Sequence, residues 1–139
     1  MCHGDFAPWN TVWASGSLVG VIDWDMAEPG RPIDDIGFLA QHLVPLRSDA
    51  WARGVGFASP PSRAARLSLL CETYGDVRPD DVVEAVFELY ERDRHRTASL
   101  GGQGKEPWTT FLRDGALDLI DGDEAWLREH GPAILDGVI

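Results

Sequence analysis

The chain has 139 residues, of which 44% are hydrophobic, and it carries a formal net charge of −11 at pH 7. This length and apolar content fit one folded domain, 1–139, with a single modest core. The negative charge disfavours a nucleic-acid partner, because phosphates would be repelled, and no apolar run approaches the roughly 20 residues that span a bilayer. We therefore expect a globular protein with no nucleic acid and no membrane among its partners.

The cysteines and the amino-terminal residues indicate a reducing compartment. Cys2 and Cys71 are the two cysteines, and neither belongs to a C-x-x-C pair. The chain opens on Met1-Cys2-His3-Gly4-Asp5, with no basic stretch and no apolar signal segment. We therefore expect two free thiols and a cytoplasmic location.

The first predicted element is a β-hairpin. Thr11-Val12-Trp13-Ala14 and Leu18-Val19-Gly20-Val21-Ile22 are β-prone, and Ser15-Gly16-Ser17 between them is typical of a turn. This hairpin, 11–23, joins two polar clusters. One runs from His3 to Asn10, and the other from Asp23 to Asp25.

Beyond the hairpin the sequence predicts only helices and loops. Apolar residues at helical spacing, with Pro, Ser or Gly at the ends, set the approximate limits. The predicted helices run from Ile33 to a limit at Pro45, from Ser62 to Gly75, from Pro79 to a loop at Gly101-Gly102-Gln103-Gly104, from Pro107 to Ile120, and from Glu124 to Glu129, with a loop from Ser48 to Pro61. One hairpin followed by a helical subdomain, 33–139, is an α+β pattern in which helix predominates.

The two polar clusters have the composition that phosphoryl transfer requires. That reaction needs a carboxylate to orient the acceptor hydroxyl and metal ions to neutralise phosphate charge, and Mg²⁺ prefers carboxylate and amide oxygens. Asp5 and Asn10 lie on one short loop, and the hairpin returns Asp23 beside them. Taken alone, Asp5 and Asn10 are also ordinary turn or cap residues. Their combination with His3 and Asp23 favours the chemical interpretation.

The spacing of these residues matches a kinase motif. The signature H-R-D-x-x-x-x-N followed by D-F-G has its counterpart in H-G-D-x-x-x-x-N, residues 3–10, and I-D-W-D, residues 22–25. With P-I-D-D-I-G at residues 32–37, the sequence resembles the aminoglycoside phosphotransferase and choline kinase family, densely from Cys2 to Leu46. The resemblance implies the carboxyl-terminal lobe of the protein-kinase-like fold, with ATP and Mg²⁺ as cofactors.

The resemblance also implies roles for individual residues. Asp5 matches the catalytic base, which accepts the proton of the substrate hydroxyl. Asn10 and Asp23 match metal ligands, and they form a metal-binding set with the segment 23–25. Asp25 lies where relatives often carry an acid, so it is either a second metal ligand or a solvated carboxylate.

Two further residues match structural supports of the catalytic loop, 3–10. His3 matches a residue that braces this loop, and Asp35 matches an aspartate that opens a helix and ties the loop down. Asp34 is interpreted as a solvated first-turn acid. The charged face of the Pro79 helix, which includes Glu84, Glu88, Glu91, Arg92, Arg94 and Arg96, is interpreted as solvated.

The chain departs from the family in what precedes His3. The family places there an amino-terminal lobe with a glycine-rich loop, a strand lysine and an adenine-binding hinge, and Lys105 lies too far along the chain to replace that lysine. We therefore expect weak or no kinase activity from the chain alone. We also expect an uncovered apolar face around Val12, Val19, Val21 and Phe38, hence a homodimer or a separate amino-terminal-lobe partner.

Three functions from different classes follow from these observations. The first is an ATP- and Mg²⁺-dependent phosphotransferase acting on a hydroxyl of a small molecule, with cationic molecules among the candidates. The second is a non-catalytic metal- or ligand-binding remnant of such a kinase. The third, a metal-dependent phosphohydrolase, is less favoured, because dinuclear hydrolases usually need several histidine ligands and only His3 is nearby.

Overall fold

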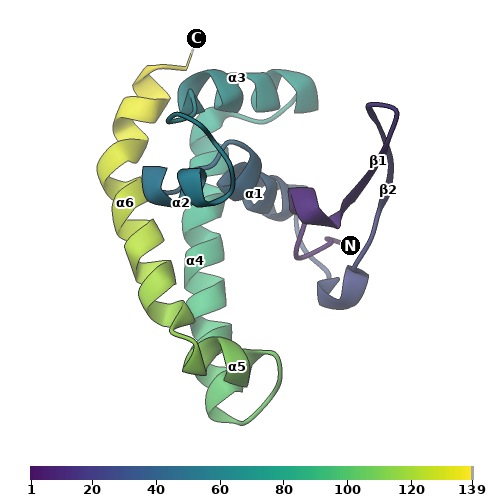
Figure 1. The fold of residues 1–139 in the computed structure, drawn as a ribbon, viewed down its shortest axis with the longest axis vertical. Helices are drawn as coiled ribbons and strands as arrows, with labels where there is room; N and C mark the ends of the chain where they lie inside the picture. Colours follow the sequence, from purple (N-terminus) through teal and green to yellow (C-terminus); the bar gives the residue numbers. More distant parts are fainter. Residues whose placement is uncertain (139) are drawn as a thin grey trace.

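The computed structural model describes residues 1–138 and is built mainly of helices around one hairpin. In chain order the elements are η1 (Pro8–Asn10), β1 (Thr11–Ala14), β2 (Ser17–Val21), η2 (Trp24–Met26), α1 (Pro32–Leu43), α2 (Asp49–Gly54), α3 (Arg63–Tyr74), α4 (Pro79–Gly102), α5 (Trp108–Arg113) and α6 (Ala116–Asp136). Helix α4 forms the spine, α6 lies alongside it, and the hairpin projects to one side (Figure 1). No helix within residues 1–138 is long and apolar enough to cross a bilayer. The predicted α+β pattern with predominant helix is confirmed.

The apolar faces of α1, α3, α4 and α6 meet in one core. Its fully buried side chains include Leu67, Val82, Val86, Tyr90 and Leu127. Each such aliphatic side chain contributes about 1.5–3 kcal/mol relative to an exposed one. At the crossing of α1 and α4 a Cβ on Gly37 would lie 3.0 Å from the Cβ of Ala85, so a glycine permits this close approach. The core thereby fixes α1, which carries Asp35, against α4.

Strands β1 and β2 form a two-stranded antiparallel sheet. The paired residues are Thr11 with Val21, Val12 with Gly20, Trp13 with Leu18 and Ala14 with Ser17. Val19 is therefore an extra residue, a bulge in β2. The turn residues Ser15 and Gly16 have φ values of 51° and 78°, which gives the positive-φ geometry that two-residue hairpin turns favour. The predicted hairpin is confirmed.

The apolar face expected beside the hairpin is present only in part. Val12 and Val19 are exposed, with 39% and 61% of their surface open to solvent. Val21 and Phe38 are half-buried, so the prediction was wrong for these two residues. Phe38 lies in α1, where its ring packs 4.9 Å from that of His42.

The predicted loop from Ser48 to Pro61 was wrong, because it contains helix α2. The Ser48 hydroxyl accepts a hydrogen bond from the N–H of Trp51 at 3.1 Å, which caps the helix. Trp51 then packs against the ring of His42 at 5.7 Å and beneath the guanidinium of Arg47 at 4.6 Å. These tertiary contacts, rather than an apolar periodicity, stabilise a helix of only six residues.

The last two predicted helices were also placed wrongly. The run from Pro107 to Ile120 is broken between α5 and α6, because Gly115 adopts a left-handed conformation with φ of 83°. Helix α6 then continues through Pro132 to Asp136 instead of ending before Gly131. The carbonyl that loses its N–H partner to Pro132 belongs to Arg128, which is exposed and can bond to water.

Candidate functional site

The loop 3–10, which carries Asp5 and Asn10, is held by Asp35 at the start of α1. The two carboxylate oxygens of Asp35 accept hydrogen bonds from the backbone N–H groups of His3, at 2.7 Å, and Gly4, at 3.0 Å. Hydrogen bonds to a charged acceptor are the strong kind, worth about 1.5–3 kcal/mol each. A single side chain therefore fixes the start of the loop to the helical core.

The imidazole of His3 links this loop to the end of β2. Its Nδ1 accepts a hydrogen bond from the N–H of Asp5 at 3.2 Å, and its Nε2 lies 2.8 Å from the carbonyl oxygen of Ile22. Because Nδ1 accepts, the proton is assigned to Nε2, which donates to that carbonyl. The ring is buried and lies 4.6 Å from the ring of Trp24. His3 thus positions Asp5 and the residue preceding Asp23.

Gly4 allows the segment after the hairpin to pack directly on the loop. Its φ is 78°, and a Cβ there would lie 2.3 Å from the carbonyl oxygen of Met26. Such a distance is far below van der Waals contact, so glycine is required on two independent grounds. This close packing brings η2, with Asp25, against the loop that carries Asp5.

Asp5 and Asn10 are in direct contact. The side-chain nitrogen of Asn10 donates to a carboxylate oxygen of Asp5 at 2.9 Å and to the Asp5 backbone carbonyl at 2.9 Å. Desolvation by burial raises the pKa of Asp5; the Asn10 hydrogen bond and His3 oppose the rise, and the charge of Asp23 adds to it. Since the nitrogen of Asn10 is committed to Asp5, its amide oxygen remains available as a ligand.

Asp23 and Asp25 line the same cleft as Asp5. Asp23 adopts a left-handed backbone conformation, φ 63° and ψ 62°, which is uncommon for a residue other than glycine. Both carboxylates are exposed and, with Asp5, line a cleft of about 720 Å³. Among residues 1–138, however, no three His, Cys, Asp or Glu side chains converge as a preformed metal site.

The far wall of the cleft comes from α4, α5 and α6, and the sequence did not point to it. Its members are Asp93, Arg96, Thr97, Glu106, Pro107, Trp108, Phe111, Ala116 and Ile120. The sequence marked Trp108, Phe111 and Ile120 only as an apolar helical stripe. Counting both walls, the cleft carries five carboxylates against the one arginine. Its charge and its aromatic rings are therefore suited to an organic cation.

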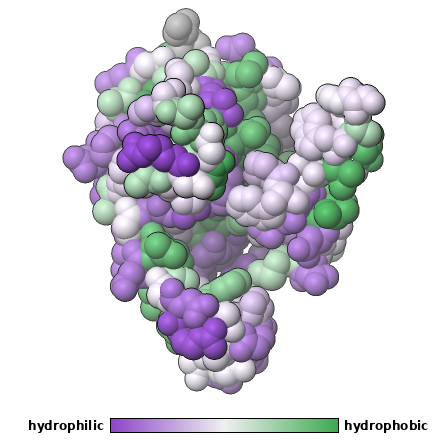
Figure 2. Space-filling model, in the orientation of Figure 1, coloured by the Kyte–Doolittle hydropathy of each residue, from purple (hydrophilic) through white to green (hydrophobic). Residues whose placement is uncertain are grey.

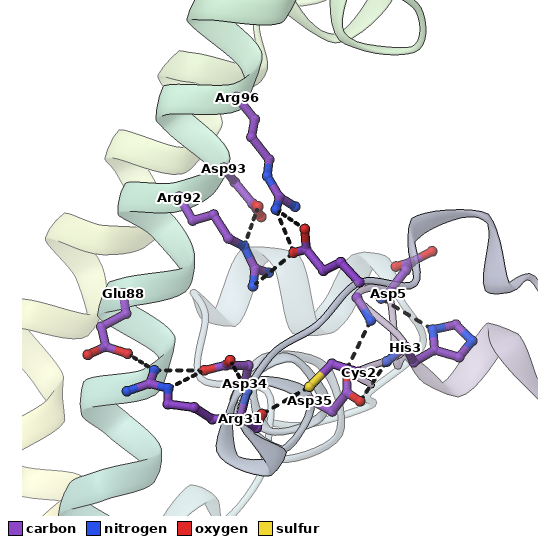
Figure 3. A network of polar contacts seen from close by, with 12 residues as sticks. Cys2, His3, Asp5, Arg31, Asp34, Asp35, Glu88, Arg92, Asp93 and Arg96 are labelled. Atoms are coloured by element: carbon purple, nitrogen blue, oxygen red, sulfur yellow. Dashed lines mark hydrogen bonds and ion pairs between the residues drawn. The ribbon is translucent and has the colours of Figure 1, made fainter.

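An ion-pair network joins α4 to the loop segments (Figure 3). The guanidinium of Arg96 donates to both carboxylate oxygens of Glu28 at 2.5 Å, and Arg92 lies 3.9 Å from Glu28. The interpretation of these two arginines as solvated was wrong, because both lie beside Glu28, which is 68 residues from Arg96 in the sequence. Glu28 in turn pairs with Cys2 through two backbone hydrogen bonds of 2.8 and 3.1 Å.

Asp93 and Asp34 do not behave as freely solvated carboxylates, because burial and neighbouring arginines shift their pKa values. Desolvation raises the pKa of Asp93 even though Arg92 and Arg96 oppose the rise, and its side chain remains 31% exposed. Asp34 is not solvated as predicted, because Arg31 binds its carboxylate at 2.7 Å and through the Arg31 backbone N–H at 2.8 Å. Partial burial would raise the pKa of Asp34, but the hydrogen bonds and charge of Arg31 lower it overall.

A comparison with curated proteins found a partial match. A trifolitoxin immunity protein of Rhizobium leguminosarum bv. trifolii is 38% identical over 73 residues, which are 52% of this chain and 28% of that protein. The chain therefore spans about a quarter of that relative's length. No solved structure matches. The family described as the phosphotransferase enzyme family, APH, matches residues 1–100, which include the loop 3–10, the hairpin and Asp35. That match covers well over half of the sequence, and the chain belongs to the phosphotransferase enzyme family.

Proposed function

We propose that this chain is the carboxyl-terminal lobe of a kinase-like small-molecule O-phosphotransferase that uses ATP and Mg²⁺. The observation that carries the proposal is the contact between Asp5 and the Asn10 amide, at the edge of a cleft that Asp23 and Asp25 also line. Family membership supports the same reaction class. The lobe assignment, the cofactors and the residue roles belong to this proposal.

The residues around the cleft fit a magnesium site that phosphate completes. Asn10 keeps its amide oxygen available, and Asp23 and Asp25 expose their carboxylates. Mg²⁺ usually takes one or two carboxylates and fills its remaining positions with water and substrate phosphate, so a three-carboxylate cage is not needed. When bound, the ion would neutralise phosphate charge. Asn10 and Asp23 are the residues that would hold it, with Asp25 as the additional acid.

Asp5 is suited to orient the acceptor. In the proposed reaction the acceptor oxygen bonds to the γ-phosphorus of ATP, the bond from that phosphorus to the bridging oxygen breaks, ADP leaves, and the hydroxyl proton passes to Asp5. Desolvation by burial raises the pKa of Asp5 from its usual value, which makes it a stronger base than a solvated carboxylate. The Asn10 amide and the His3 ring fix the orientation of its side chain and backbone.

The cleft favours an acceptor that carries positive charge next to a hydroxyl group. Asp93 and Glu106 face the same space as Asp5, and Trp108 and Phe111 supply aromatic faces beside them. A cation gains from the carboxylates and from cation–π contact, whereas a polyanionic acceptor would be repelled. Arg96 does not offset this charge, because Glu28 already occupies its guanidinium.

The groups that clamp the nucleotide are proposed to lie outside this sequence. The hairpin is the one sheet that residues 1–138 form, and the curated relative extends well beyond the matched segment. We therefore expect the chain alone to bind Mg·ATP weakly and to transfer phosphate slowly or not at all. Adding a polypeptide that supplies the missing clamp would restore the rate.

The test is calorimetric titration of the chain with Mg·ATP, followed by a γ-phosphate transfer assay with a panel of small hydroxylated amines. Wild-type binding that is lost in Asp23→Ala and kept in Asp136→Ala, an exposed aspartate at the end of α6, supports the proposal. Slow transfer by the wild-type chain that Asp5→Asn abolishes supports the assigned base, whereas robust transfer by the chain alone would contradict a nucleotide clamp outside this sequence. Equal nucleotide binding by wild type and Asp23→Ala would refute the metal site.

A second candidate is a ligand-binding role without transfer. The name of the relative, an immunity protein for trifolitoxin, favours it, because protection from a toxin can come from binding as well as from modification. In that case a cationic ligand binds the cleft in the absence of Mg·ATP. The affinity then falls in Asp93→Asn and is unchanged in the control Asp136→Ala, which lies outside the cleft.

A further inference from the structure

The hairpin is an uncharged projection on a strongly acidic chain. Residues 11–22 contain no ionisable side chain, although the whole chain has a net charge of −11. Trp13, Leu18 and Val19 are 62%, 47% and 61% exposed. Figure 2 shows apolar surface on the arm that projects from the body, at the place of β1 and β2 in Figure 1.

Both faces of this sheet carry apolar side chains. Trp13 and Leu18 are a cross-strand pair and share one face, where the indole N–H of Trp13 donates to the Thr11 hydroxyl at 2.9 Å. Val12, paired with Gly20, lies on the other face. A two-stranded hairpin is marginally stable at best in water. An exposed hairpin of this kind gains stability from a surface that covers it.

The exposed apolar surface continues onto residues that flank the hairpin. Trp9, Ile22 and Trp24 are 56%, 51% and 53% exposed. A tryptophan side chain can bury about 150–250 Å². Trp9, Trp13 and Trp24 are each more than half exposed, so together they present on the order of 300 Å². With the aliphatic side chains the patch exceeds the apolar patches usual on monomers and approaches the roughly 800 Å² that each partner contributes to a standard interface.

Charge decides which partner fits this surface. A basic partner would be attracted to the carboxylates of the helical part of the chain and not to the uncharged hairpin. A partner of the same negative sign can approach only where charge is absent. A strand of four or five residues extends about 13–17 Å, so two hairpins that lie side by side, each reaching the base of the other, would hold the two acidic helical parts farther apart than the Debye length of about 8 Å. The partner that meets these conditions without any further assumption is a second copy of this chain.

We propose that two copies of this chain form a dimer by packing their hairpins, residues 11–22, against each other about a two-fold axis. The packing is isologous, so Trp13 and Val19 of one copy meet the same patch on the other. The hairpin starts directly after Asn10, and the Ile22 N–H donates to the Asn10 carbonyl at 3.0 Å. Dimerisation would therefore also hold rigid the base of the hairpin, from which Asn10 and Asp23 extend. The proposal does not depend on phosphoryl transfer.

The experiment is sedimentation velocity from 1 to 300 μM on the full chain, on Trp13→Ser/Val19→Ser, and on the control Leu69→Ser/Leu119→Ser. The control residues are 63% and 65% exposed on α3 and α6, so both variants remove comparable apolar surface. We expect a wild-type dimer, a hairpin variant whose dimer Kd rises about tenfold or more, and an unchanged control. Raising NaCl from 50 to 500 mM should tighten the wild-type dimer, because it screens repulsion between the two acidic bodies.

A trapping experiment keeps the proposal testable if the hairpin variant unfolds. Val19→Cys lies midway along β2 and is exposed, whereas Cys2 and Cys71 are buried. Mild oxidation should cross-link Val19→Cys to its copy, and the control Leu119→Cys should remain monomeric. A wild-type monomer throughout the concentration range, or cross-linking of both cysteine variants at equal rates, overturns the proposal. A wild-type monomer would assign the hairpin to a different polypeptide, such as a separate amino-terminal lobe.

Discussion

The carboxylate of Asp35 accepts the backbone N–H of His3 at 2.7 Å, from 32 residues farther along the chain. The same carboxylate accepts the N–H of Gly4 at 3.0 Å, so one side chain anchors the start of the loop 3–10 to α1. The contact between Asp5 and Asn10 lies within this anchored loop.

Removing the anchor should destabilise the protein. Asp35→Ala deletes the acceptor for two N–H groups, and each hydrogen bond to a charged acceptor is worth about 1.5–3 kcal/mol. We expect the free energy of unfolding in urea to fall by about 2–4 kcal/mol. Asp35→Asn, which retains one acceptor, should lose less, and Glu129→Ala, at an exposed site on α6, should change it by less than about 0.5 kcal/mol. An Asp35→Ala variant as stable as Glu129→Ala would contradict the anchor.

Substitutions at Gly4 and Gly16 distinguish the cost of a steric clash from the cost of a positive φ, because the two glycines have the same φ but different surroundings. Gly4 and Gly16 both have φ of 78°, but a Cβ on Gly4 would lie 2.3 Å from Met26 O, whereas one on Gly16 would meet nothing within 4 Å. Gly16→Ala should therefore cost only the left-handed conformation, about 1–2 kcal/mol. Gly4→Ala should cost clearly more, because the Met26 carbonyl belongs to the backbone. Urea unfolding of both variants checks the order, and equal losses would contradict the close packing of the two segments.

Burial of His42 should make stability depend on pH. Desolvation lowers the pKa of His42 to about 4 from a usual value of 6.5, with Arg47 adding to the effect and the Phe38 carbonyl opposing it. The unfolded chain therefore binds a proton that the folded chain excludes, and stability falls as pH drops from about 6.5 towards about 4. The loss attributable to His42 is up to about 3 kcal/mol. His42→Asn should flatten the pH profile in this window, and an unchanged slope would contradict a buried neutral ring.

The ionised carboxylate of Asp93 should lower the free energy of unfolding and strengthen the binding of a cationic ligand. Its raised pKa means that the ionised carboxylate is disfavoured in the fold, so its contribution to stability declines as pH rises through the folded pKa. At pH 7 we expect Asp93→Asn to unfold at an equal or higher urea concentration than wild type. The same variant should bind a cationic ligand such as choline more weakly. A variant that loses both stability and binding would indicate a purely structural residue.

The local parts of the fold could be predicted from the sequence. The hairpin follows from two β-prone runs around Ser15-Gly16, and α3 and α4 follow from apolar spacing with Gly75 and Pro79 at their boundaries. The grouping of Asp5, Asn10 and Asp23 could be expected because a hairpin returns the chain to its starting point. In the structure Asp5 and Asn10 touch, and Asp5 and Asp23 line one cleft.

The remaining features depend on contacts between distant residues. Helix α2 depends on the packing of Trp51 against His42 and Arg47. Six residues are too few for an apolar periodicity to predict this helix from the sequence. The break before α6 depends on a left-handed Gly115 within an otherwise continuous apolar stripe. The pairing of Arg96 with Glu28 turns an arginine that looked solvated into a link between α4 and the site.

The central claim, a divalent-cation site formed by Asn10 and Asp23 beside Asp5, is tested most directly by titrating the ¹⁵N-labelled chain with Mn²⁺. The paramagnetic ion broadens the amide signals of residues near it. We expect broadening to begin at residues 4–10 and 22–25 and to be lost in Asp23→Asn. Broadening that begins instead at the acidic first turn of α4, at Asp80 and Asp81, or that persists unchanged in Asp23→Asn, would contradict the claim.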